Sequence, residues 1–229
     1  MKSKNLFISG VILLLTVSFI FAGWGRRGQR GNKNVQVIND MVSQMPYEEL
    51  SDAEKNYILK MREEEKLARD VYLTLYETWG SRVFINISGS EQTHMDAVKS
   101  LIDKYGLKDP LVNNEVGFFS DPKLKELYET LVSKGKTSIT NAFTIGATIE
   151  DLDIYDLDEA ILKADNMDVV FVFENLRKGS ENHMRAFVFQ LNNYGLTYTP
   201  QYISQEEFDR IISENSTGGH GYGRRNRNW

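Results

Sequence analysis

Residues 91–97 read Glu-Gln-Thr-His-Met-Asp-Ala, and Tyr-Gly-Leu follows at residues 105–107. A related stretch, His-Met-Arg-Ala at residues 183–186, is followed by Tyr-Gly-Leu at residues 194–196, at the same offset from its histidine. We infer that the chain uses one type of helical hairpin twice. Two such hairpins packed together predict a bundle of four long helices.

Apolar residues recur at helical spacing through most of the chain, and no segment carries a convincing strand pattern. Ser51 and Glu54 have the spacing of a capping box, which predicts a helix from Ser51 to about Gly80. Residues 82–87 are expected to be extended. Further helices are expected over residues 88–104, 138–163, 167–194 and 204–212, and a short helix starting at Asp121-Pro122. The predicted fold class is all-α, a four-helix bundle built from two helical hairpins, with a short inserted helix and a short C-terminal helix.

The composition narrows the chemistry that this chain can perform. It contains no cysteine, which excludes disulfides, iron–sulfur clusters and thiolate zinc sites. No glycine-rich loop lies in the strand-to-helix context that nucleotide binding requires. The three histidines belong to the two hairpins and to the C-terminal tail, so the sequence also disfavours a Ser-His-Asp hydrolase.

The two ends of the chain differ in composition from its centre. Residues 1–23, with two lysines before an apolar run from Leu6 to Ala22, resemble a signal peptide or a membrane anchor. The sequence does not decide whether this segment is cleaved off, because Ile20 or Phe21 occupies a position where signal peptidase sites prefer a small residue. Residues 24–46 are predicted to be a Gly/Arg-rich linker, residues 47–214 the helical bundle, and residues 215–229 a disordered Gly/Arg-rich tail.

These boundaries predict an exported protein, whether periplasmic, secreted or anchored to the outer face of the cytoplasmic membrane. Contact with the membrane is expected only through the N-terminal segment. Between Asn34 and Thr217 the chain has 18 Lys and Arg against 32 Asp and Glu, a net charge of −14. Such an acidic region would repel phosphates, so no nucleic-acid partner is expected.

Charged residues interrupt the apolar faces of the predicted helices at corresponding places. Glu65 is the only charge on its apolar stripe, and Glu91 lies one helical turn before His94. A buried carboxylate is unfavourable unless it is paired or bound to metal. Glu63 and Glu64 fall to the sides of the stripe and are expected to be solvated. The candidate metal ligands are Glu65, Glu91, His94, Glu150 and His183.

The second half of this pattern departs from the first. Ser180 stands three residues before His183, where symmetry with Glu91 would require a glutamate, and Glu181 points to another side of the helix. The group could bind two metals with Asp153 or Glu174 as a replacement ligand, bind one metal, or persist as a hydrogen-bonded polar core without metal. The residues expected to support or replace ligands are Tyr72, Asp153, Glu174 and Ser180. Gly146 and Ala147 are small enough for a neighbouring helix to approach closely.

Three strings carry a resemblance to a known family: EEEKLARDVY at residues 63–72, SEQTHMDAV at residues 90–98 and IEDLD at residues 149–153. They resemble domain of unknown function 2202, a ferritin-like family, over about residues 48–203. That family name implies no established reaction. Membership of the wider ferritin-like superfamily would imply a di-iron or di-manganese carboxylate site that handles dioxygen, peroxide or ferrous iron.

Two classes of function follow from these observations. The first is an oxidoreductase of ferroxidase or peroxidase type, with iron or manganese as cofactor, zinc as a frequent substitute, and ferrous iron, oxygen or peroxide as substrate. The second is a non-catalytic helical module with a degenerate site that binds metal or a partner, and a purely structural bundle is a weaker third reading. Metal ions are the expected partners, and whether the chain forms a homodimer stays open.

Overall fold

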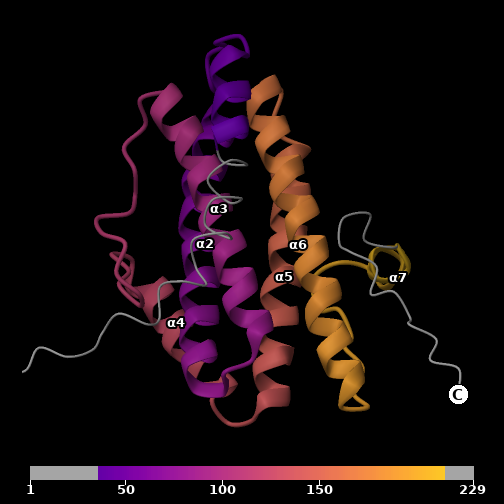
Figure 1. Cartoon of the computed structure of the whole chain (residues 1–229). Coiled ribbons are helices and arrows are strands. Elements are labelled where there is room, and N and C mark those ends of the chain that lie inside the picture. The colour runs from indigo at the N-terminus through magenta and orange to yellow at the C-terminus, as the bar shows by residue number, and fades with distance from the viewer. Residues whose placement is uncertain (1–35, 215–229) are drawn as a thin grey trace, which may run out of the picture.

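The computed structural model describes residues 36–214, and every regular element in this range is a helix (Figure 1). The expectation of an all-α protein is therefore confirmed for this part of the chain. A first helix covers residues 36–44. The others are α2 (Asp52–Trp79), α3 (Arg82–Lys104), α4 (Pro122–Gly135), α5 (Ile139–Ile161), α6 (Met167–Asn193) and α7 (Gln205–Ser213).

Four long helices lie side by side along most of their length (Figure 1). Helix α2 packs along α3, and α5 packs along α6, so each pair joined by a short connection forms a hairpin. The hairpins meet through contacts of α3 with α6 and of α2 with α5. Helix α4 lies against both α2 and α5, whereas α7 contacts α6.

The helix boundaries follow local chemistry that is legible in the sequence. The backbone N–H of Ser51 donates to Oε2 of Glu54 (2.8 Å), and the N–H of Glu54 donates to Oγ of Ser51 (3.2 Å), which confirms the predicted capping box. Helix α2 ends at Gly80, whose φ of 64° is favourable for glycine because it has no Cβ. Asp121 caps α4, and Pro122 occupies its first turn as expected.

Two segments differ from their predicted conformations. Residues 82–87 were expected to be extended, but α3 already begins at Arg82. Their β-branched residues favour a strand locally, yet Phe84 and Ile87 continue the buried face of α3 at helical spacing, and tertiary packing prevails. Residues 36–44, which the composition predicts to be part of a linker, are helical, and Val42 is buried. The ammonium of Lys104 binds the carbonyl oxygen of Val42 at 3.0 Å.

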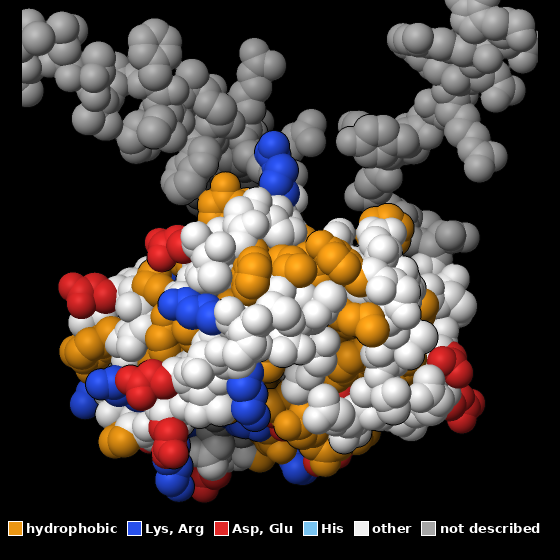
Figure 2. Space-filling view, turned by 90° about the horizontal axis from the view of Figure 1, so that it is seen from below, with side chains coloured by type: hydrophobic (Ala, Val, Ile, Leu, Met, Phe, Trp, Pro, Cys, Tyr) orange, Lys and Arg blue, Asp and Glu red, His pale blue; other side chains and the backbone are white. Residues whose placement is uncertain are grey.

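The predicted signal or anchor segment, residues 24–35 of the predicted linker and the predicted C-terminal tail lie outside the described residues. Among the described helices, none is long and apolar enough to cross a membrane. Figure 2 shows one end of the helical domain, where hydrophobic side chains reach the surface among acidic and basic ones.

The hydrophobic core consists of two clusters rather than one. The first includes Val71, Phe84 and Phe187, and the second includes Met61, Val98 and Leu176. Along α2, Glu65 lies between Met61 and Val71, which belong to different clusters. The same alternation occurs along α3, where Glu91 and His94 lie between Phe84 and Val98. We call the intervening buried cross-section the polar layer; it contains Glu65, Glu91, His94, Glu150, Ser180 and His183.

Buried polar contacts fasten the segments that surround the four long helices. Lys66 is fully buried, and its ammonium binds Oδ2 of Asp70 at 2.5 Å and the carbonyl oxygen of Glu115 at 2.9 Å, which holds the loop before α4. Asp151 of α5 accepts hydrogen bonds from the hydroxyl of Tyr198 (2.8 Å) and the N–H of Ile203 (3.0 Å). These contacts fix the chain on both sides of the bundle.

Helix α7 is held by ion pairs with α6. Glu207 of α7 accepts hydrogen bonds from Arg210 (2.6 Å) and from Arg177 of α6 (2.6 Å). Arg210 first, and then Arg177, lower the pKa of Glu207 to about 2 despite partial burial. Glu181 pairs with the same two arginines, which confirms that it points away from the polar layer.

Candidate metal centre

The candidate ligands come from four different helices and meet inside the bundle. Glu65 projects from α2, Glu91 and His94 from α3, Glu150 from α5 and His183 from α6. All five are buried, and none is more than 7% exposed. Amphipathic packing turns the same face of each helix inward, so a charge on that face is carried into the core.

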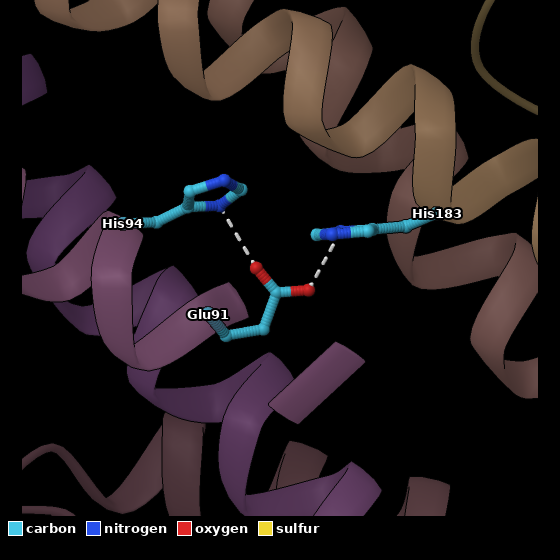
Figure 3. A group of neighbouring side chains, drawn as sticks. All are labelled: Glu91, His94 and His183. Carbon is cyan, nitrogen blue, oxygen red and sulfur yellow. Dashed lines mark ion pairs between the residues drawn. The ribbon is translucent and has the colours of Figure 1, made fainter. Parts of the chain in front are cut away.

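Glu91 lies between the two imidazoles (Figure 3). Its Oε2 is 2.9 Å from Nδ1 of His94, and its Oε1 is 2.9 Å from Nδ1 of His183. The rings of the two histidines are stacked, with centroids 5.4 Å apart. Each of the two carboxylate oxygens of Glu91 thus faces a different imidazole.

The other two glutamates complete each half of the group. Oε2 of Glu65 lies 3.1 Å from Nδ1 of His94, and Oε2 of Glu150 lies 3.4 Å from Nδ1 of His183. Each histidine therefore faces Glu91 and one further glutamate. One ligand atom each from Glu91, His94 and His183 can be chosen so that all three lie within 4.8 Å of one another, a spacing that can hold a metal ion.

Several polar atoms in the layer have no hydrogen-bond partner among the described residues: Oε1 of Glu65, Oε1 of Glu91 and Nδ1 of His183. The last two are 2.9 Å apart, so their distance suits a hydrogen bond but their direction does not. A buried polar atom without a partner is unfavourable by about 1–3 kcal/mol. Buried oxygen and nitrogen atoms without hydrogen-bond partners fit a metal site, because a metal ion binds through the lone pairs of such atoms.

The pKa shifts in the polar layer indicate how its carboxylates and imidazoles share protons in the absence of a cation. Burial raises the pKa of Glu65, although His94 opposes this effect. Burial disfavours the charged form of Glu91 too, but the two imidazoles prevail and lower its pKa. The facing carboxylates outweigh burial and raise the pKa of both His94 and His183. Protons therefore balance part of the charge, and metal binding would release them.

Tyr72 and Ser180 position carboxylates at the edge of the layer. The hydroxyl of Tyr72 donates to Oε1 of Glu150 at 2.5 Å. The hydroxyl of Ser180 donates to Oδ2 of Asp153, which stands one turn after Glu150 on α5. Burial, with the nearby charges of Glu65 and Glu150, raises the pKa of Asp153 well above its usual value. Asp153 thus places a carboxylate opposite the serine that stands where symmetry would require a glutamate.

Two glycines allow the close approach of side chains in and beside the layer. A Cβ on Gly179 would lie 2.3 Å from Nε2 of His94, so only glycine leaves room for that ring against α6. A Cβ on Gly146 would lie 2.5 Å from the ring of Phe187, which confirms the prediction that this small residue lets a neighbouring helix approach. Gly179 was not singled out from the sequence, because its role depends on a contact with another helix.

Two acidic residues lie elsewhere than the sequence suggested. Glu174 is on the exposed side of α6 and does not join the buried group, so Asp153 alone of the two suggested replacements lies inside. Glu64 was expected to be solvated, but its side chain is only 21% exposed and its Oε2 is buried without a hydrogen bond among the described residues. Helix α4 packs against α2 and α5 and helps to enclose a cavity that Glu64 lines. Neither placement could be read from α2 or α6 alone.

Fold and site together define a protein whose described part, residues 36–214, is all-helical and contains a buried carboxylate and histidine group that can hold a metal ion. Its sequence matches, over residues 54–215, the profile of the family described as Uncharacterized protein domain (DUF2202). The chain belongs to this family, and the resemblance drawn from the three strings of sequence is confirmed to that extent.

Two comparisons with other proteins support the assignment. The chain is 58% identical over 180 residues to the uncharacterised protein MJ0754 of Methanocaldococcus jannaschii, an alignment that covers 79% of this chain and 97% of the relative. It also resembles the crystal structure of hypothetical protein MJ0754 from Methanococcus jannaschii, with a TM-score of 0.74 and 59% identity over 75% of this chain and 98% of that one.

Proposed function

We propose that this protein is a ferritin-like carboxylate protein whose polar layer binds two metal ions, iron or manganese. In this proposal it acts as an oxidoreductase on ferrous iron, oxygen or peroxide. The observation that carries the proposal is the position of Glu91, whose two oxygens each lie 2.9 Å from a different imidazole nitrogen. A carboxylate so placed can bridge two cations.

The ligands divide into two sets that share Glu91. Glu65 and His94 would hold one ion, and Glu150 and His183 the other, with one oxygen of Glu91 in each set. Asp153 supplies a further carboxylate. Such oxygen and nitrogen donors suit iron and manganese, and zinc can occupy them as well.

The charge of the group favours two cations over one. With neutral imidazoles and ionised carboxylates, Glu65, Glu91 and Glu150 in the polar layer and Asp153 beside it carry four negative charges. Unbalanced charges in such a place are strongly unfavourable, and two divalent ions would neutralise them.

The side chains of the layer would orient and protect the chemistry. Bound iron or manganese would supply electron transfer, which the surrounding side chains do not provide. Tyr72 fixes Glu150 through its hydrogen bond, and Ser180 fixes Asp153. The two apolar clusters exclude water from above and below the layer. Glu65 and the two imidazoles, whose pKa values are raised, can hold protons that would leave when cations bind.

A second function rests on Ser180. Because this residue provides a hydroxyl instead of a glutamate carboxylate, the group has one carboxylate between the two imidazoles, Glu91, where the symmetric pattern would have two. If only the half around His94 holds an ion, the protein is a non-catalytic module that binds metal or a partner. Under either function we propose export through the N-terminal segment, to the periplasm, the exterior or the outer face of the membrane.

The test is the metal content of the full chain, purified without affinity tags or chelators and supplied in turn with iron, manganese and zinc. We expect two ions per chain, and we expect Glu91→Gln to lose them because the amide keeps the shape of the side chain but not its charge. The matched control is Glu174→Gln on the exposed side of α6. One ion per chain would favour the non-catalytic module, and a folded protein that takes up none of the three metals would refute metal binding under both functions and favour a partner-binding or structural module.

If two ions are found, the next measurement is oxidation of bound ferrous iron by oxygen and by hydrogen peroxide. Consumption of either oxidant by the loaded protein, and not by the Glu91→Gln variant, would support the oxidoreductase. A loaded protein that consumes neither oxidant would leave metal binding intact and refute the catalytic part.

A further inference from the structure

A cavity of about 100 Å³ opens beside the polar layer, between α2, α4 and α5. Its walls are mainly apolar. They are formed by Leu67 of α2, by Leu124, Leu127 and Leu131 of α4, and by Ile149 and Leu152 of α5. Helix α4 contacts both α2 and α5, and the cavity lies between these three helices.

The inner end of this cavity is acidic. Glu65, Glu91, Glu150 and Asp153 all line it, so it reaches the polar layer. Glu64 lines it as well. Oε1 of Glu64 is 3.6 Å from the ammonium of Lys60, but its Oε2 is buried without a hydrogen-bond partner. The cavity therefore combines leucine walls with the carboxyl group of Glu64, one oxygen of which has no hydrogen-bond partner among the described residues.

We propose that this cavity binds a small uncharged organic molecule with a short aliphatic body and one hydroxyl group. The aliphatic body would lie against the leucines of α4, and the hydroxyl would donate to Glu64. The role of this molecule as a substrate, rather than only as a ligand, rests on the proposed metal centre.

Three physical arguments define this class of ligand. An apolar cavity of about 150 Å³ accommodates benzene, which has six heavy atoms. The cavity of about 100 Å³ in this protein therefore accepts a molecule of about four heavy atoms. A charged molecule would lose its water among the leucines, which is strongly unfavourable. A purely apolar molecule would leave Oε2 of Glu64 without a partner, whereas a hydroxyl satisfies it.

The experiment uses the full chain in its metal-free form, with propan-1-ol and xenon as probes and the leucine methyl NMR signals as the readout. We expect both probes to shift the signals of Leu67, Leu124 and Leu131. Glu64→Leu should weaken propan-1-ol binding about tenfold and leave xenon binding unchanged, because only the alcohol uses the carboxylate. Lys60 keeps a partner in this variant, since it also pairs with Asp156 at 2.8 Å.

Leu131→Phe should abolish binding of both probes by filling the cavity. If that variant fails to fold, Leu127→Phe repeats the test at a more exposed position of the same wall, where Leu127 is 39% exposed. The control is Leu162→Phe at the end of α5, where the side chain is 79% exposed and binding should not change.

The outcomes separate this inference from the proposed function. Absence of methyl shifts with both probes would overturn the binding site, and equal loss of propan-1-ol and xenon in Glu64→Leu would overturn the role of the carboxylate. A protein that binds propan-1-ol but takes up no metal would refute the proposed metal centre and leave the binding site standing.

Discussion

Substitution of Gly179 by alanine tests whether the close approach of α6 positions His94. The added Cβ would lie 2.3 Å from Nε2 and 2.5 Å from Cε1 of that ring. Both distances are about 1 Å shorter than an ordinary contact. The ring cannot withdraw freely, because its Nδ1 faces Glu91 at 2.9 Å and Glu65 at 3.1 Å.

The expected magnitude combines two opposing effects. Overpacking in a dense interior destabilises a protein by about 1–3 kcal/mol, whereas alanine is favoured over glycine inside a helix by about 0.5–1 kcal/mol. The net expectation for Gly179→Ala is destabilisation by about 0.5–2 kcal/mol, from the same two effects. Displacement of His94 should also weaken metal binding at least tenfold, because the ligand geometry is disturbed.

Gly89→Ala is the matched control, since Gly89 lies within α3 and a Cβ there meets nothing within 4 Å. This variant should gain about 0.5–1 kcal/mol from helix propensity alone. The assays are urea unfolding of the metal-free protein and calorimetric titration with manganese. If Gly179→Ala were stabilised as much as Gly89→Ala and bound manganese normally, the contact between α6 and His94 would not hold the site together.

Three further predictions concern other parts of the fold. Tyr72→Phe should destabilise the metal-free protein by about 1–3 kcal/mol in urea unfolding, because Glu150 loses its hydroxyl donor; an unchanged midpoint would contradict this. Lys66→Met should destabilise by about 1–3 kcal/mol, since Asp70 loses one of its two buried cationic partners and keeps Arg69, and a smaller effect than at the exposed Lys99 would show that the pair is unimportant. The pKa of Glu207 is lowered from 4.5 to about 2, so its stabilisation of α7 is complete above about pH 4.5 and is lost as the pH falls through 2. Opening of α7, measured by amide hydrogen exchange, should therefore become more frequent as the pH falls from 4.5 to about 2. Unchanged protection of α7 over this range would show that the ion pairs of Glu207 with the arginines do not stabilise the helix.

Local motifs carried most of the information that was correctly predicted from the sequence. The capping box at Ser51 and Glu54 and the proline at the start of α4 act within a few residues, so a single sequence displays them. The burial of the candidate ligands is legible for a related reason, because a charge such as Glu65 on an apolar helical face must be buried with that face.

Features that depend on a second helix were not legible in this way. The partial burial of Glu64 requires α4 to lie against α2 and α5, and the constraint on Gly179 exists only because His94 of another helix faces it. The helical conformation of residues 82–87 is likewise set by packing, since Phe84 and Ile87 fit the core only as part of α3. Local preference is a weak guide where tertiary contacts decide.

The division of the core by the polar layer links the stability of this protein to its surroundings. The two apolar clusters adjoin across a cross-section in which carboxylates and imidazoles replace hydrophobic contacts, so each cluster is a natural unit of local unfolding. A cation that binds only the folded chain at 100 times its dissociation constant adds about 2.7 kcal/mol to the free energy of unfolding. With such a cation in the layer, resistance to proteolysis rises and falls with the metal supply outside the chain, and the lifetime of the molecule becomes a measure of that supply.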